Sequence, residues 1–296
     1  LDALWSSIVA AEQAGNEDVR AESLVHYMYV LAERRPDAFE FDKVAEIAQA
    51  LVARIAPESR LQGQIFNNMG LMHAVHGRFD EAEVLFRRGL GVIERAVGPE
   101  HPDVAFLRGN LGNGLLKQGR LAEAHELLLD AHSQVQAQLG EGHYAAAALK
   151  VMLADSLLKQ GRYDEALGYV ERGALGLISV AGNENPDLGW ALTVRGEIRL
   201  QRGEIDMAVI DLERAVQVID THNLVVLKVR VRFALAQALW RAGKDRDLAL
   251  REARIAVVEA ERSHDNSLAV IKGWIGERTQ TGAARGEDRR GSSPSP

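Results

Sequence analysis

Three groups of residues have the types and spacing that metal binding or catalysis would need. His73 and His76 stand three positions apart, but two imidazoles make only half of a tetrahedral zinc site, and no third ligand is evident. The adjacent carboxylates Asp164 and Glu165 open a predicted helix, where negative charge favours the helix dipole. The glycine-rich run 109–114 follows no predicted strand and has no lysine placed for a phosphate group. We therefore predict no catalytic residue, no metal site and no cofactor.

The composition is typical of a helical protein that binds neither membranes nor nucleic acids. Hydrophobic residues make up 47% of the 296 residues and aromatic residues only 5%, with alanine and leucine dominant. The absence of cysteine excludes disulfides and thiolate metal sites, and we expect a cytoplasmic protein. A net charge of −7 argues against nucleic-acid binding. No apolar run approaches the ~20 residues that span a bilayer.

The elements that must position any binding residue follow from a repeat of glycine turns. Gly77, Gly119, Gly161 and Gly203 succeed one another at 42-residue steps, and Gly243 follows 40 residues later. A small residue stands seven positions before each of them, and an alanine stands five positions after the first four. Glycine accepts a positive φ and turns the chain sharply, while small residues let two helices approach closely. The repeat therefore predicts a stack of antiparallel helix hairpins.

The end of each repeat unit also has a regular pattern. Gly98, Gly140 and Gly182 end the second helices at the same phase. Asn185-Pro186-Asp187 is typical of a helix start, with a capping side chain, a proline in the first turn and an acidic residue after it. His101 and His143 occupy the same place as Asn185, so we predict that these histidines cap helices.

These features resemble the tetratricopeptide repeat. The small residue, the turn glycine and the following alanine match its most diagnostic positions, although the usual unit has ~34 residues. The longer unit, with Gly-Pro-Glu-His-Pro-Asp-Val-Ala at 98–105, is similar to the kinesin light chain type. The resemblance implies an all-α fold, a right-handed superhelix of antiparallel helix hairpins, in which the first helix of each hairpin lines a concave groove.

We expect four parts in the chain. Residues 1–60 are predicted to form degenerate leading repeats, with helices at about 2–14, 17–33 and 39–55. Residues 61–262 hold about five hairpins, and residues 263–275 form a capping helix. Residues 276–296 are predicted to be a disordered tail, because they lack apolar periodicity. Since the chain begins at Leu1 and not at methionine, we interpret it as a segment of a longer protein.

The resemblance places the peptide-binding groove on the face of the first helices that points away from their hairpin partners. Positions thirteen, nine and six residues before the turn glycines mark this face. The candidates at or beside these positions are Asn67, Asn68, Phe106, Asn110, Asn113, Asp155, Trp190, Glu197, Arg230 and Gln237. An amide both donates and accepts hydrogen bonds, which suits a peptide backbone. The asparagines could instead bond between neighbouring helices, and the tryptophans, with Trp240, could instead pack between repeats.

The charges of these candidates predict the character of a ligand. Asp155 and Glu197 make the groove acidic, which favours a peptide with apolar anchors and a basic residue. Chaperone-binding members of the family grip a C-terminal carboxylate with basic residues on the third hairpin. Ala148 and Met152 stand at those positions here, so we do not expect that activity.

A second resemblance concerns the parent protein. Asn67-Asn68-Met69-Gly70 and the run Gly-Arg-Tyr-Asp-Glu-Ala at 161–166 are similar to repeats in the C-terminal halves of large bacterial serine/threonine kinases, especially myxobacterial ones. This implies a non-catalytic arm that binds proteins or extended peptides for a signalling kinase. The alternative is a peptide-sensing regulator attached to a DNA-binding domain or to another effector domain. An enzyme with an atypical groove would have only scattered carboxylates to use. The sequence sets no oligomeric state.

Overall fold

The computed structural model describes residues 1–34, 39–222, 225–243, 245–263 and 265–288, and all regular structure in these residues is α-helical. The helices are α1 (Asp2–Gln13), α2 (Glu17–Arg34), α3 (Phe41–Ile55), α4 (Arg60–Val75), α5 (Phe79–Val97), α6 (Pro102–Lys117), α7 (Leu121–Leu139), α8 (Tyr144–Lys159), α9 (Tyr163–Ala181), α10 (Pro186–Arg202), α11 (Ile205–Asp220), α12 (Val225–Ala242), α13 (Arg246–Ser263) and α14 (Leu268–Asp288).

The residues that were expected to begin and end helices are found at the helix boundaries. The turn glycines between paired helices adopt positive φ, for example 80° at Gly119 and 76° at Gly161. His101 Nδ1 accepts a hydrogen bond from the backbone N–H of Asp103 at 3.2 Å, and the Asn185 side chain does the same for Asp187 at 2.8 Å. Both side chains therefore cap a helix N-terminus, as the repeat predicts.

Small residues set the distance between the two helices of a hairpin. A Cβ built on Gly112 of α6 would lie 2.8 Å from Leu128 Cγ of α7, and one on Gly196 of α10 would lie 2.6 Å from Leu212 Cγ of α11. Neither contact is tolerable, so these glycines let the helices touch. The expectation that the small residues mark close helix approach is confirmed.

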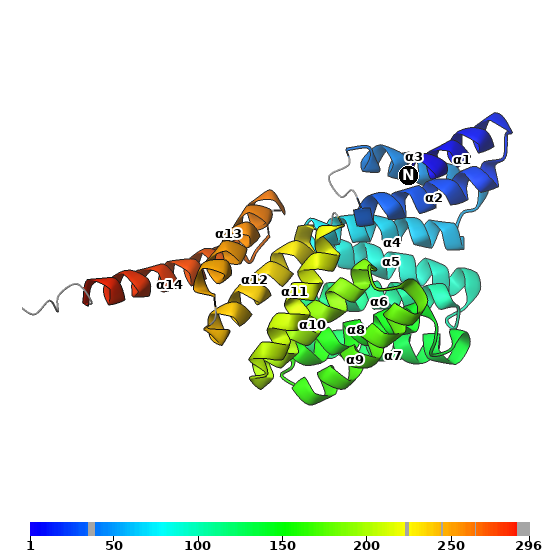
Figure 1. Ribbon diagram of the computed structural model, residues 1–296. Coiled ribbons are helices and arrows are strands. Elements are labelled where there is room, and N and C mark those ends of the chain that lie inside the picture. The colour runs from blue at the N-terminus through cyan, green and yellow to red at the C-terminus, as the bar shows by residue number, and fades with distance from the viewer. Residues whose placement is uncertain (35–38, 223–224, 244, 264, 289–296) are drawn as a thin grey trace, which may run out of the picture.

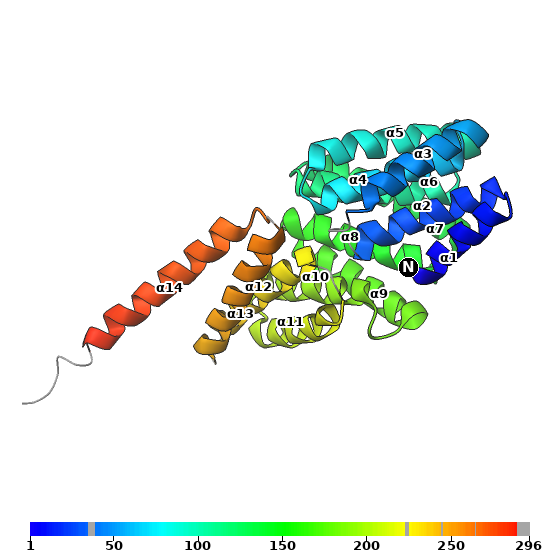
Figure 2. The same cartoon turned by 90° about the horizontal axis from the view of Figure 1, so that it is seen from above.

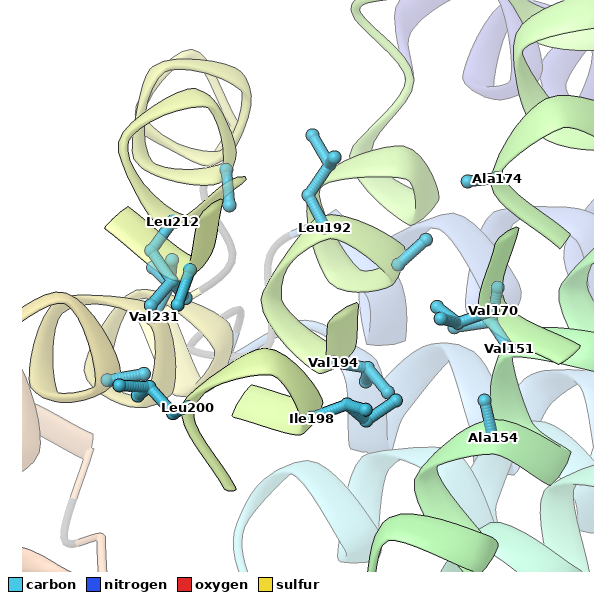
Figure 3. Close-up of a cluster of buried hydrophobic side chains, with 14 of the residues drawn as sticks. Val151, Ala154, Val170, Ala174, Leu192, Val194, Ile198, Leu200, Leu212 and Val231 are labelled. Carbon is cyan, nitrogen blue, oxygen red and sulfur yellow. The ribbon is translucent and has the colours of Figure 1, made fainter. Parts of the chain in front are cut away.

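The hairpins stack side by side (Figures 1 and 2). The first helices α2, α4, α6, α8, α10 and α12 contact one another in order, and the second helices pack between successive first helices. The buried side chains form a layer that continues from one hairpin to the next, as Figure 3 shows for Val151, Val170, Ile198 and Leu212. The stack thereby creates one wall made only of first helices.

The C-terminal end differs from the expected boundaries. The last helix runs from Leu268 to Asp288 and projects from the stack (Figure 1), whereas a cap ending at 275 and a disordered tail from 276 were expected. The helix-favouring residues Glu277, Arg278 and Gln280 explain how the helix passes Gly276. Residues 289–296 lie outside the described residues. None of the described helices is long and apolar enough to cross a membrane.

Candidate functional site

One ion-pair cluster identifies the inner side of the stack. Arg230 of α12 contacts Asp155 of α8, although α10 lies between these helices in the row. First helices two repeats apart can meet only on the side toward which the stack curves. The face that carries these residues is therefore concave, and we call the residues on it the groove face.

Arg230 binds two carboxylates at once. Its Nη1 and Nη2 donate to the two carboxylate oxygens of Asp155 at 2.8 and 2.7 Å, and its Nε donates to Glu197 Oε1 at 3.0 Å. Asp155 is 1% exposed, while the side chains of Arg230 and Glu197 are 20% and 22% exposed. Three of the candidates from three first helices thus form one cluster, which we call the Arg230 cluster. Both carboxylates are bound by Arg230, which halves the negative charge that the sequence predicted for this part of the groove.

The pKa values in the Arg230 cluster follow from this pairing. Burial opposes ionisation of Asp155, but the charge and hydrogen bonds of Arg230 outweigh it and lower the pKa of Asp155 to about 2. Burial likewise disfavours the charged guanidinium of Arg230, yet Asp155 and Glu197 raise its pKa well above the usual value. Asp155 and Arg230 are therefore both charged near neutral pH.

The asparagine candidates form a second group at the other end of the groove face. Asn110 Nδ2 donates to Asn67 Oδ1 at 2.8 Å, Asn67 Nδ2 donates to Asn68 Oδ1 at 3.2 Å, and Asn68 Nδ2 donates to the Val25 carbonyl at 2.9 Å. Asn67 and Asn68 are 8% and 3% exposed, so they serve as buried links between α6, α4 and α2. Asn68 therefore forms a hydrogen bond between neighbouring helices, which is the alternative to a role in binding a ligand.

Two asparagines remain partly open on the groove face. Asn110 and Asn113 are half-buried and lie one turn apart on α6. Asn113 has no hydrogen-bond partner in the described part of the chain. Phe106, one turn before Asn110, is 40% exposed. These three side chains give α6 an amide and aromatic surface that contacts solvent.

The remaining candidates have mixed surroundings. Trp190 of α10 is half-buried against the largest apolar cluster. Trp240 of α12 packs edge-on against Trp274 of α14, with ring centroids 5.8 Å apart, so it belongs to the contact with the last helix. Gln237 of α12 is half-buried. Packing between elements thus accounts for Trp240.

The histidines are placed as structural residues. His76 Nδ1 lies 2.8 Å from the Met72 carbonyl of its own helix, and burial lowers the pKa of His73. Within the described ranges, no three or more histidine or acidic side chains converge as metal ligands would.

Sequence reasoning missed two basic residues on the same face. Lys117 follows Asn113 by four positions on α6, and Lys159 follows Asp155 by four positions on α8. Both stand two residues before a turn glycine, and this shared spacing was the signal that could have found them. The charges of Lys117 and Lys159 help to lower the pKa of Asp155, which places both ammonium groups near the Arg230 cluster.

One protein-family model matches the chain, and it does so in three overlapping ranges. The tetratricopeptide repeat model matches residues 61–137, 110–174 and 144–220, which together exceed half of the chain. No curated protein sequence matches the chain.

Solved structures with similar folds share little sequence with this chain. NprR in complex with its cognate peptide NprX is 13% identical, with a TM-score of 0.71 over 95% of this chain and 81% of that one. A Rap protein complexed with competence and sporulation factor is 12% identical, with a TM-score of 0.68 over 90% and 77%. A putative kinesin light chain from Podosopora anserina is 20% identical, with a TM-score of 0.51 over 70% and 99%. At these identities, the likeness establishes the helical solenoid fold.

Proposed function

The chain belongs to the tetratricopeptide repeat family, and on this premise we propose that its groove face binds an extended segment of a partner protein. The observation that carries the proposal is the open surface of α6. There, Asn113 presents an unused amide beside the half-buried Asn110 and the exposed ring of Phe106. An amide can pair with both the N–H and the C=O of an extended backbone, and an exposed ring offers an apolar anchor.

The proposed role is non-catalytic. Family membership favours a scaffold, and the carboxylates of the Arg230 cluster are held by a guanidinium, so they are poorly placed to act as acid or base. Hydrolysis of ATP or of an ester by the purified protein, traced to a groove residue by substitution, would contradict this role.

We further propose that the chain is the interaction arm of a bacterial signalling serine/threonine kinase in the cytoplasm. The resemblance of the repeats at 67–70 and 161–166 supports this origin. The alternative, a peptide-sensing regulator, is favoured by the likeness to NprR, solved in complex with its cognate peptide, and to the Rap protein, solved in complex with competence and sporulation factor. The sequence of the full-length protein tests the choice, because a kinase domain in it would favour the first and a DNA-binding domain the second.

Selection of binders from a library of random dodecapeptides, with the full chain as bait, tests the groove proposal. The Asn113→Ala variant should bind the selected peptides about fivefold more weakly, because one hydrogen bond of about 1 kcal/mol is lost. Fluorescence anisotropy measures the affinity. Asn113 is a sharper probe than Asn110, whose removal would leave the buried oxygen of Asn67 without its donor.

The control is Asn266→Ala, which changes an exposed asparagine between α13 and α14. Both variants should keep the unfolding free energy of the parent within about 0.5 kcal/mol. Failure to select any binder, or equal affinities of the two variants, would contradict the groove assignment.

A further inference from the structure

We propose that Lys117 and Lys159 form an anion site on the groove face that takes a carboxylate of the bound segment. The carboxylate is either an aspartate or glutamate side chain or the C-terminus of the segment. This inference rests on the proposed function and adds the chemistry of the ligand to it. It reverses the expectation of a basic ligand residue.

The two lysines occupy equivalent places in successive repeats. Each lies in the last turn of a first helix, Lys117 on α6 and Lys159 on α8, and these helices contact each other in the row. Both side chains are solvent-exposed, and neither ammonium group has a hydrogen bond or salt bridge within the described part of the chain. Each ammonium therefore retains three donors for a ligand.

The nearby carboxylates do not serve as partners for these lysines. Arg230 directs its donors to both Asp155 and Glu197, so these carboxylates are paired with the guanidinium and half of their negative charge is neutralised. Counted together, the Arg230 cluster and the two lysines carry one net positive charge. An incoming carboxylate therefore meets an excess of cationic groups that are not already paired.

Lys117 is also held in a concave environment. Its side chain reaches solvent, yet surrounding protein lowers its pKa, with the charge of Arg230 contributing in the same direction. A group that is both accessible and incompletely hydrated gains more from an anion than a lysine on a convex surface does, because the effective dielectric constant is lower there.

The anion site continues the amide surface of α6. Residues 110, 113 and 117 are separated by three and four positions, so their side chains follow one another along one helix face. A segment held at Asn110 and Asn113 can thus place a carboxylate one turn further along. The site is separate from Ala148 and Met152, the positions at which the basic clamp of chaperone-binding relatives would stand.

The peptides selected from the dodecapeptide library test this inference. Binders should be enriched in aspartate and glutamate, or should lose affinity when their C-terminus is amidated; these two arms distinguish the source of the carboxylate. Lys117→Gln/Lys159→Gln should weaken binding by about tenfold or more and reduce its salt dependence. Lys117→Glu/Lys159→Glu should regain affinity for peptides whose acidic residue is changed to lysine.

The matched control is Lys43→Gln, which removes the same charge from an exposed position on α3 and should leave affinity unchanged. Circular dichroism should give the parent's melting curve for the glutamine variants. Binders without acidic enrichment and without dependence on a free C-terminus would overturn the anion site while leaving the groove intact. Undiminished affinity of the double glutamine variant would do the same. Absence of any binder would overturn both proposals.

Discussion

Asp155 is a buried carboxylate whose ionisation depends on Arg230. Its pKa is about 2 in the folded protein, against 3.8 for the unperturbed group. A lowered pKa means that the folded state favours the ionised form, so the stabilisation is complete above about pH 4 and disappears as the pH falls toward about 2. The shift corresponds to about 2 kcal/mol.

This shift predicts how the Asp155→Asn variant responds to acid. The difference in unfolding free energy between the parent and the variant should shrink by about 2 kcal/mol as the pH falls from about 5 to about 2, because only the parent has this carboxylate to protonate. Urea denaturation across this pH range measures it. The comparison with the variant is necessary because the pKa of Glu83 is also about 2. If the unfolding free energies of the parent and of Asp155→Asn changed with pH in parallel, the proposed role of Asp155 would be contradicted.

Single residues were the hardest level to predict from the sequence. Repeat spacing correctly put Asp155, Glu197 and Arg230 on first helices, but it did not reveal that one guanidinium joins them. That pairing depends on the curvature accumulated over two repeats, which no local pattern encodes. The contact of Asn68 with the Val25 carbonyl was hidden for a related reason, since the leading helices lack the regular spacing.

At the scale of elements, hairpin packing gives a pair of substitutions with opposite expected signs. Gly196→Ala should destabilise the protein by about 1–3 kcal/mol, because the new Cβ would lie 2.6 Å from Leu212 Cγ. Gly168→Ala, inside α9, should stabilise it by about 0.5–1 kcal/mol, because its Cβ would meet only the end of the Arg172 side chain at 3.6 Å. Chemical denaturation measures both.

Each glycine variant serves as the control for the other. Both add one methyl group to a helical glycine, so propensity alone predicts stabilisation in both cases. If Gly196→Ala were as stable as Gly168→Ala, close approach would not be the reason for the small residue in the repeat.

Helices were predicted well because each has local signals. Periodic apolar residues, capping side chains and turn glycines all lie within a few positions of the boundaries they set, and the leading helices at 2–13, 17–34 and 41–55 agree with expectation to within about two residues. The end of α14 was not predicted, because residues 276–288 lack an apolar stripe and their helix continues from a packed segment at Ile271 and Trp274.

At the scale of the whole molecule, solenoids are usually described as rows in which each repeat contacts only its neighbours. The Arg230 cluster breaks that rule, since it joins α12 to α8 across the intervening hairpin. The sequence predicted the stack but not this link. The link acts on the three hairpins formed by α8 to α13, and α8 also carries Lys159 of the proposed anion site.

We expect the link to make these three hairpins open together. In the parent, the slowest amide protons of α8, α10 and α12 should exchange with one common free energy. In Arg230→Met, protection of α12 should fall below that of α8 by about 3 kcal/mol, because a buried charge pair is broken from one side. Native-state hydrogen exchange measures this. Unequal protection in the parent, or no change in the variant, would contradict the link.

The Arg230 cluster therefore changes the cooperativity of the array. An array with only nearest-neighbour couplings frays from its ends one unit at a time, whereas a coupling between two outer units is lost as soon as either of them unfolds. The central repeats then behave as a single folding block within an otherwise modular protein. A ligand that binds any one of these three repeats would therefore stabilise all three against unfolding.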